Sequence, residues 1–156
     1  MHHNWLGLAL KREGDIAGAE KELQRAVELG PDQVGPAANL GSLYLLEGRW
    51  NDAIEVLERA IARDPGSLET RVNLVVALGR LGRIDQARDR FDEGIRGGVR
   101  TPSLYNAMAF AYQLGGHPQD AARLLKISLG LDPRQPDALN LLHQVEPRGS
   151  AGQAGQ

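Results

Sequence analysis

The sequence contains no cysteine among its 156 residues, and only 4% of them are aromatic. Without cysteine the chain has no disulfide, no thiol nucleophile and no cysteine-ligated zinc site. The lack of disulfides is compatible with any compartment and so does not fix one. The low aromatic content limits the number of side chains of the type that dominates most binding surfaces.

Long apolar runs and an excess of one charge are also missing. Apolar runs such as residues 74–78 are far shorter than the roughly 20 residues of a membrane-spanning helix, so we expect a soluble protein. The formal net charge is −2, with acids and bases interspersed, which argues against nucleic acid or a membrane surface as the partner. The first residues lack the basic leader and cleavage site of a signal peptide, which favours a cytoplasmic location.

What the sequence does contain is a period of 34 residues. Each of four glycines is followed five residues later by an alanine, at Gly14 and Ala19, Gly48 and Ala53, Gly82 and Ala87, and Gly116 and Ala121. Other columns keep the same step, for example Leu6, Leu40, Leu74 and Met108. A period of this length indicates an array of helical repeats. We place the units at about residues 1–33, 34–67, 68–101 and 102–135.

Each unit is predicted to fold as two amphipathic helices joined by a tight turn. In the second unit Leu40, Leu43 and Tyr44 recur at helical spacing, and the same spacing returns over residues 54–61. Gly48 lies between the two stretches, where a left-handed backbone costs little only for glycine. The unit is therefore expected to be helix, turn, helix.

These columns resemble the tetratricopeptide repeat. The second unit carries the pattern most fully, in Leu40-Gly41, Tyr44, Gly48, Ala53, Leu57, Ala60 and Asp64-Pro65. The resemblance covers nearly the whole chain and implies an all-α fold, a right-handed α-solenoid over residues 1–145. Residues 136–145 are expected to form a capping helix with Leu139 and Leu142 facing inward. Residues 146–156 are expected to form a disordered tail, because they carry almost no apolar side chains.

The third unit departs most from the pattern. Val75 stands where Gly41 stands one unit earlier, and Gly94 stands where Ala60 stands one unit earlier. A glycine inside a helix costs roughly 1 kcal/mol relative to alanine, so the second helix of this unit is predicted to be the weakest. Thr101, directly before Pro102, is predicted to cap the next helix.

The sequence offers little for catalysis. None of His2, His3, His117 and His143 forms a recognisable constellation with a carboxylate. His2 and His3 are adjacent, so on a helix their rings cannot share a metal as residues three or four apart can. Residues 94–98 lack the lysine and the serine or threonine of a phosphate-binding loop. We therefore predict no enzyme activity, no catalytic residue, no metal site and no cofactor.

The resemblance also implies where a partner binds, because the first helix of each tetratricopeptide unit lines a concave groove. Transferred by column, the groove residues are Asn4, Trp5, Leu8, Arg12, Asn39, Ser42, Leu46, Asn73, Val76, Arg80, Asn106, Phe110 and Leu114. Asn39 and Asn73 share a column, and amides there could hold the main chain of an extended peptide. The alternative is that these amides bond across a helix junction. The apolar members predict a partner with apolar anchors, either an extended segment or an amphipathic helix.

We accordingly predict a noncatalytic protein-interaction adaptor whose partner is a protein or peptide, with no nucleic-acid binding and no membrane insertion. One alternative is a substrate-docking repeat segment of a larger enzyme, such as a protein glycosyltransferase or hydroxylase, because the first helix begins without its opening turn. Another is a self-assembling scaffold. Trp5, Leu6 and Leu10 have no preceding helix, so end-to-end stacking of chains could cover them.

Overall fold

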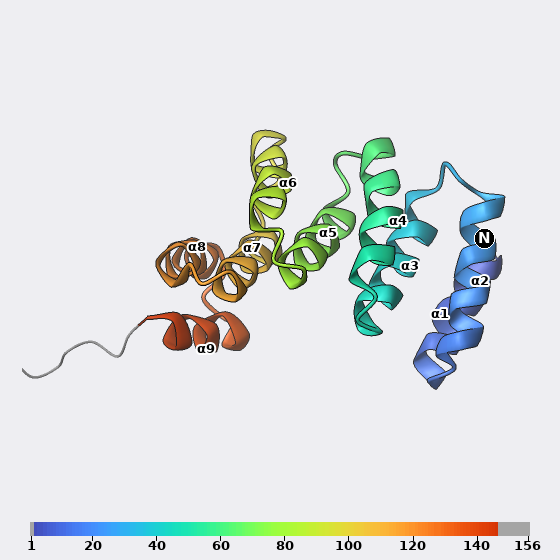
Figure 1. Cartoon of the computed structure of the whole chain (residues 1–156), viewed down its shortest axis with the longest axis horizontal. Helices are drawn as coiled ribbons and strands as arrows, with labels where there is room; N and C mark the ends of the chain where they lie inside the picture. The colour runs from blue at the N-terminus through green and yellow to red at the C-terminus, as the bar shows by residue number, and fades with distance from the viewer. Residues whose placement is uncertain (1, 147–156) are drawn as a thin grey trace, which may run out of the picture.

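The computed structural model describes residues 2–146, which form nine helices and no strand. The helices are α1 (His2–Glu13), α2 (Ile16–Leu29), α3 (Val34–Leu46), α4 (Trp50–Arg63), α5 (Leu68–Arg80), α6 (Ile84–Arg96), α7 (Pro102–Leu114), α8 (Pro118–Leu131) and α9 (Pro136–Val145). Figure 1 shows them as a row, with α1 and α2 at one end and α8 and α9 at the other. The predicted all-α fold of helix-turn-helix repeats is confirmed. Of the predicted tail, residues 147–156 lie outside the described part.

None of these helices combines the length and the apolar composition that crossing a membrane requires.

The turn inside each unit depends on a glycine with a left-handed backbone. Gly48 has a φ of +74°, and the Arg49 N–H beyond it donates to the Tyr44 carbonyl at 2.8 Å. The matching glycines have φ values of +86° at Gly14, +69° at Gly82 and +77° at Gly116. This geometry satisfies carbonyls that a helix end leaves free, and it returns the chain at once into the second helix.

Small residues allow the paired helices to approach each other closely. A Cβ added at Gly41 would lie 2.6 Å from the Leu57 side chain, and one added at Gly7 would lie 2.7 Å from Leu23. The alanines of the period, Ala19, Ala53, Ala87 and Ala121, are all 0% exposed. Large side chains such as Leu57 fill the space that these residues leave, which is how the interior reaches close packing.

Arg49 links the second helices of the first two units. Its guanidinium donates to Glu20 Oε1 on α2 at 2.8 Å and to Asp52 Oδ2 on α4 at 2.7 Å, and it lies 4.2 Å from the Tyr44 ring centroid. The hydrogen bond to Asp52, followed by that to Glu20, raises the pKa of Arg49. The phenol of Tyr44 also has a raised pKa, chiefly because it is desolvated by burial.

In the third unit α6 continues through Gly94 to Arg96 without a break. A Cβ at Gly94 would lie 2.5 Å from Cδ of Arg71, whose residue is only 3% exposed. The Arg71 guanidinium donates to the Arg90 carbonyl at 2.8 Å and to the Pro65 carbonyl at 2.6 Å, and lies 3.6 Å from Glu93. The absence of a side chain at Gly94 therefore leaves the space that the buried Arg71 side chain occupies.

Two local predictions were only partly right. Thr101 occupies the N-cap position of α7, but its side chain makes no capping bond and instead lies 3.2 Å from the Ser103 hydroxyl. The following Pro102 lacks an N–H, so one fewer donor needs a cap there.

The second correction concerns α9, where Leu139 is 40% exposed while Ala138 and Val145 are 2% and 7% exposed. Leu141 and Leu142 are partly buried against the core. The inward positions thus follow the spacing of three, four and seven residues from Ala138. The helix is rotated by one residue from the orientation that was expected.

Candidate protein-binding groove

At the N-terminal end of the array, polar groove residues form side-chain hydrogen bonds between the neighbouring first helices α1 and α3. Asn39 on α3 donates to Asn4 on α1 at 2.8 Å. Lys11 on α1 donates to the Ser42 hydroxyl on α3 at 3.1 Å. For Asn39 the geometry thus favours the alternative in which the amide joins neighbouring helices.

Several other groove residues are largely open to solvent. Trp5 and Leu46 are each 66% exposed, and Leu114 is 47% exposed. Arg12 is exposed and Leu8 is partly buried on the same helix, α1. Leu46 and Leu114 are the last residues of α3 and α7, so they lie at the rim of the array.

At the C-terminal end, Val76, Asn106 and Phe110 come together in a hollow of about 440 Å³. We call it the apolar hollow; its lining is Val72, Val76, Ser103, Asn106, Ala107, Phe110, Leu125, Asp137, Ala138 and Leu141. These residues come from α5, α7, α8 and α9. Asn73 lies partly buried on α5 and is not part of this lining.

Asn106 brings an unusual polar group to the hollow. Its amide donates to Gln135 Oε1 at 2.7 Å. Its Oδ1 atom is buried and accepts no hydrogen bond from any residue between 2 and 146. A buried acceptor without a donor is rare and calls for an explanation, such as a ligand or a water.

Arg80 lies between two aromatic rings beside the hollow. Its guanidinium carbon is 4.6 Å from the ring centroid of Phe110 on α7 and 5.5 Å from that of Trp50 on α4. Such cation–π contacts hold a planar cation over the ring face. Arg80 therefore links three helices, and Trp50 is a neighbour of the groove that the sequence analysis missed.

The contribution of α9 was also missed. Asp137, Ala138 and Leu141 line the hollow, although this helix was expected only to cap the array. Leu141 lies 34 residues after Ala107 in the sequence. Extending the period by one more helix would have identified it.

The histidines make local contacts. His3 Nδ1 lies 2.6 Å from Glu22 Oε2, and the His117 ring packs edge-on against Tyr112 with centroids 5.9 Å apart. Over residues 2–146 no group of three histidine, cysteine or acidic side chains is placed to hold a metal.

Comparison with known structures supports the fold. TTC0263, a thermophilic TPR protein of Thermus thermophilus, superimposes with a TM-score of 0.78 at 24% identity, over 92% of this chain and 79% of that one. Pseudomonas aeruginosa pilF superimposes with a TM-score of 0.78 at 20% identity, over 92% of this chain and 66% of that one. At these identities the likeness concerns the fold alone.

Comparison with known sequences adds the family. Human Protein O-mannosyl-transferase TMTC1 is 23% identical over 137 residues, which are 88% of this chain but only 15% of that protein. Two family models, each described as Tetratricopeptide repeat, match residues 4–68 and 44–109. Because the two matches together extend over residues 4–109 and the helices repeat with the same period, the chain belongs to the tetratricopeptide repeat family, whose domains generally mediate protein–protein interactions.

Proposed function

We propose that the chain is a noncatalytic interaction module that binds a peptide segment or a helix of a partner protein along the groove residues. The observation that carries this proposal is the apolar hollow, which combines aliphatic and aromatic walls with a few polar groups. Hollows of that composition are the usual form of binding sites. A partner that binds here contributes an apolar anchor residue, in the manner of helix-in-groove recognition.

The hollow has the chemistry to hold such an anchor. Burial of one large apolar side chain contributes about 1.5–3 kcal/mol. Asn106 adds a side-chain amide to the lining, and rotation of that side chain would present its buried Oδ1 to a main-chain N–H next to the anchor. Asp137 adds a carboxylate to the lining, which favours a donor or a positive charge at that point of the partner.

We assign a main-chain contact to Asn73 rather than to Asn39. The amide of Asn39 is already bonded to Asn4. The side chain of Asn73 makes no hydrogen bond to another residue between 2 and 146. Its amide can therefore offer both a donor and an acceptor to one peptide unit.

The test is capture of a partner on the purified chain, compared with Val76→Asp. Val76 lines the hollow, so a carboxylate there should remove a specific partner from the retained proteins, as identified by mass spectrometry. Ile127→Asp is the matched control, because Ile127 is 43% exposed on α8. Circular dichroism establishes that both variants are folded.

Loss of one discrete partner with Val76→Asp alone would support the proposal. Equal capture by the wild type and both variants would place the binding surface elsewhere and contradict it.

One alternative has a specific observation in its favour. The match to TMTC1 covers 15% of the length of that enzyme, so a tetratricopeptide segment like this one can be a small part of a larger enzyme. In that case the groove would dock substrates for a catalytic domain elsewhere in the same polypeptide. A longer reading frame that includes a catalytic domain would favour this alternative.

Self-assembly is the other alternative, supported by the 66% exposure of Trp5 and the 37% exposure of Leu6 on α1. Light scattering at high protein concentration tests this alternative, because a chain that stays monomeric would contradict end-to-end assembly.

A further inference from the structure

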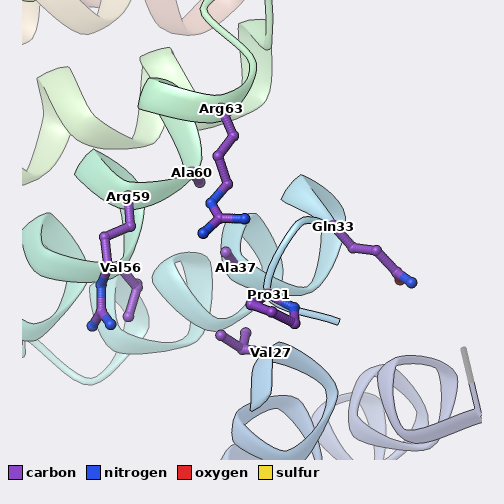
Figure 2. Close-up of a pocket in the computed structure, with 8 residues that line it drawn as sticks. All are labelled: Val27, Pro31, Gln33, Ala37, Val56, Arg59, Ala60 and Arg63. Carbon is purple, nitrogen blue, oxygen red and sulfur yellow. The ribbon is translucent and has the colours of Figure 1, made fainter. Parts of the chain in front are cut away.

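A second, smaller cavity lies on the side of the second helices, between α2 and α4. Its volume is about 90 Å³, and Figure 2 shows the side chains around it. We call it the inter-helix slot; it is lined by Val27, Pro31, Gln33, Ala37, Val56, Arg59, Ala60 and Arg63. None of these is a groove residue, so the slot is separate from the site proposed above.

The 34-residue period shows what fills this space in the next unit. Ala37 corresponds to Arg71 one unit later. Arg71 donates to the carbonyls of Pro65 and Arg90, which are the counterparts of the slot residues Pro31 and Val56. Its Cδ also occupies the space beside Gly94, the counterpart of Ala60. The slot is thus the same position in the repeat, with the filling side chain reduced to a methyl group.

The following unit fills the position with an aromatic side chain. Tyr105 is the next residue of the Ala37 column, and it is 8% exposed. Its ring contacts Phe91 edge-on, with centroids 5.6 Å apart. The same architecture therefore accepts either an arginine or an aromatic ring.

The charges around the slot distinguish between these two occupants. The guanidinium of Arg71 faces Glu93 at 3.6 Å, whereas the counterpart of Glu93 in the slot is Arg59. Arg63 adds a second guanidinium to the lining. A cationic occupant would meet like charge, while an aromatic ring presents the negative face that a guanidinium attracts.

Both arginines already have carboxylate neighbours, Glu55 for Arg59 and Asp32 for Arg63. These carboxylates are exposed, with side-chain exposures of 72% and 92%. Exposed ion pairs contribute little stability, so an acidic group next to the ring can exchange with them.

We propose that the inter-helix slot binds one tyrosine or phenylalanine side chain of a partner protein, with an acidic group beside that aromatic residue. The partner's ring takes the place that Tyr105 occupies two units later, and its acidic neighbour pairs with Arg59 and Arg63. The slot is therefore a second binding site, on the side of the second helices, whereas the groove residues lie on the first helices.

The probe is 4-hydroxyphenylacetate, a tyrosine-like ring that carries a carboxylate. Tyramine, the same ring with an ammonium group, is the charge-reversed control, and acetate is the control without a ring. Methyl resonances of Val27, Ala37 and Val56 are followed by NMR during titration of the 156-residue chain. We expect saturable shifts with 4-hydroxyphenylacetate at millimolar concentration, at least fivefold weaker binding of tyramine, and no saturation with acetate.

Two variants test the assignment. Ala37→Tyr introduces the side chain of the Tyr105 column and should abolish the shifts of Val27 and Val56 while the chain stays folded. Arg59→Glu alters only the exposed rim and should reverse the preference in favour of tyramine. Arg88→Glu, the same charge change on the exposed face of α6, should leave both titrations unchanged.

The proposal is overturned if neither ring compound shifts these methyl groups, if only Val72 and Val76 in the hollow respond, or if Arg59→Glu leaves the preference unaltered. If a partner binds at the apolar hollow but neither ring compound binds in the slot, this proposal is contradicted and the adaptor function is unaffected.

Discussion

At the scale of single residues, the third unit departs from the second at two positions that fit each other. Arg71 stands where Ala37 stands one unit earlier, and Gly94 replaces an alanine where the arginine side chain passes. A buried arginine needs partners for its donors, and the carbonyls of Pro65 and Arg90 supply them. Neither departure is therefore a defect by itself.

The pair leads to a prediction about Gly94→Ala. Replacing an interior helical glycine by alanine ordinarily stabilises a helix by roughly 1 kcal/mol. Here the new methyl group would lie 2.5 Å from Arg71 Cδ, and such overpacking costs about 1–3 kcal/mol. We expect net destabilisation, measured as the free energy of unfolding in urea.

The double variant Arg71→Ala with Gly94→Ala provides the control. Once the arginine is shortened, adding the alanine should no longer destabilise the protein, which gives an interaction free energy of about 1 kcal/mol or more between the two sites. Additive effects of the two substitutions would show that the contact does not determine the choice of glycine.

A second prediction concerns the turn glycines. Gly48→Ala forces a side chain into a left-handed backbone with a φ of +74°, which costs about 1–2 kcal/mol. Gly130→Ala is the matched substitution, because Gly130 is helical and a Cβ there meets nothing within 4 Å. Thermal unfolding should show a lower Tm for Gly48→Ala and an equal or higher Tm for Gly130→Ala. A similar Tm for both would contradict the role of the turn.

At the scale of elements, α9 both covers α8 and completes the apolar hollow. Ala138 is 2% exposed, whereas the adjacent Leu139 is 40% exposed. Ala138 faces inward and belongs to the lining of the hollow. The docking of this one helix therefore determines whether the hollow exists.

This placement predicts different outcomes for two neighbouring substitutions. Ala138→Asp buries a carboxylate without a partner, so α9 should undock and the amides of residues 136–145 should exchange hydrogen much faster. Leu139→Asp places the same charge at the exposed position and should change exchange little. Hydrogen exchange followed by mass spectrometry measures both, and faster exchange in Leu139→Asp alone would restore the orientation expected from the sequence.

At the scale of the whole molecule, the array has helices with neighbours on both sides and helices with a neighbour on one side only. The column of Leu6 shows this difference, because Leu6 is 37% exposed while Leu40, Leu74 and Met108 are between 0% and 3% exposed. In a linear array stability is the sum of unit and interface contributions. The two ends of this chain are therefore held by fewer interfaces.

We predict a gradient of amide protection along the chain. Helices α1 and α9 should exchange with the lowest opening free energies, and α3 to α7 with the highest, because local opening follows the loss of buried contacts. Uniform protection of all helices would indicate that this 156-residue chain unfolds as one cooperative unit instead.

The sequence by itself determined the fold at the level of the repeat. The glycine and alanine columns determine the turns and the close helix contacts, because tolerance of a positive φ and a small side-chain volume are properties of the residue type. They also predicted the helix pairs and the first-helix location of Val76, Asn106 and Phe110. These features are local or periodic, so one sequence contains them.

Only the tertiary structure decided how these residues are used. In the structure Asn39 donates to Asn4, and Arg80 contacts two aromatic rings. Leu139 faces solvent, and residues of α9 line the apolar hollow. The tertiary structure also placed Arg71 in a space that remains open beside Ala37. Each of these outcomes depends on the rotation of one helix against another, and contacts between helices follow from packing rather than from the period.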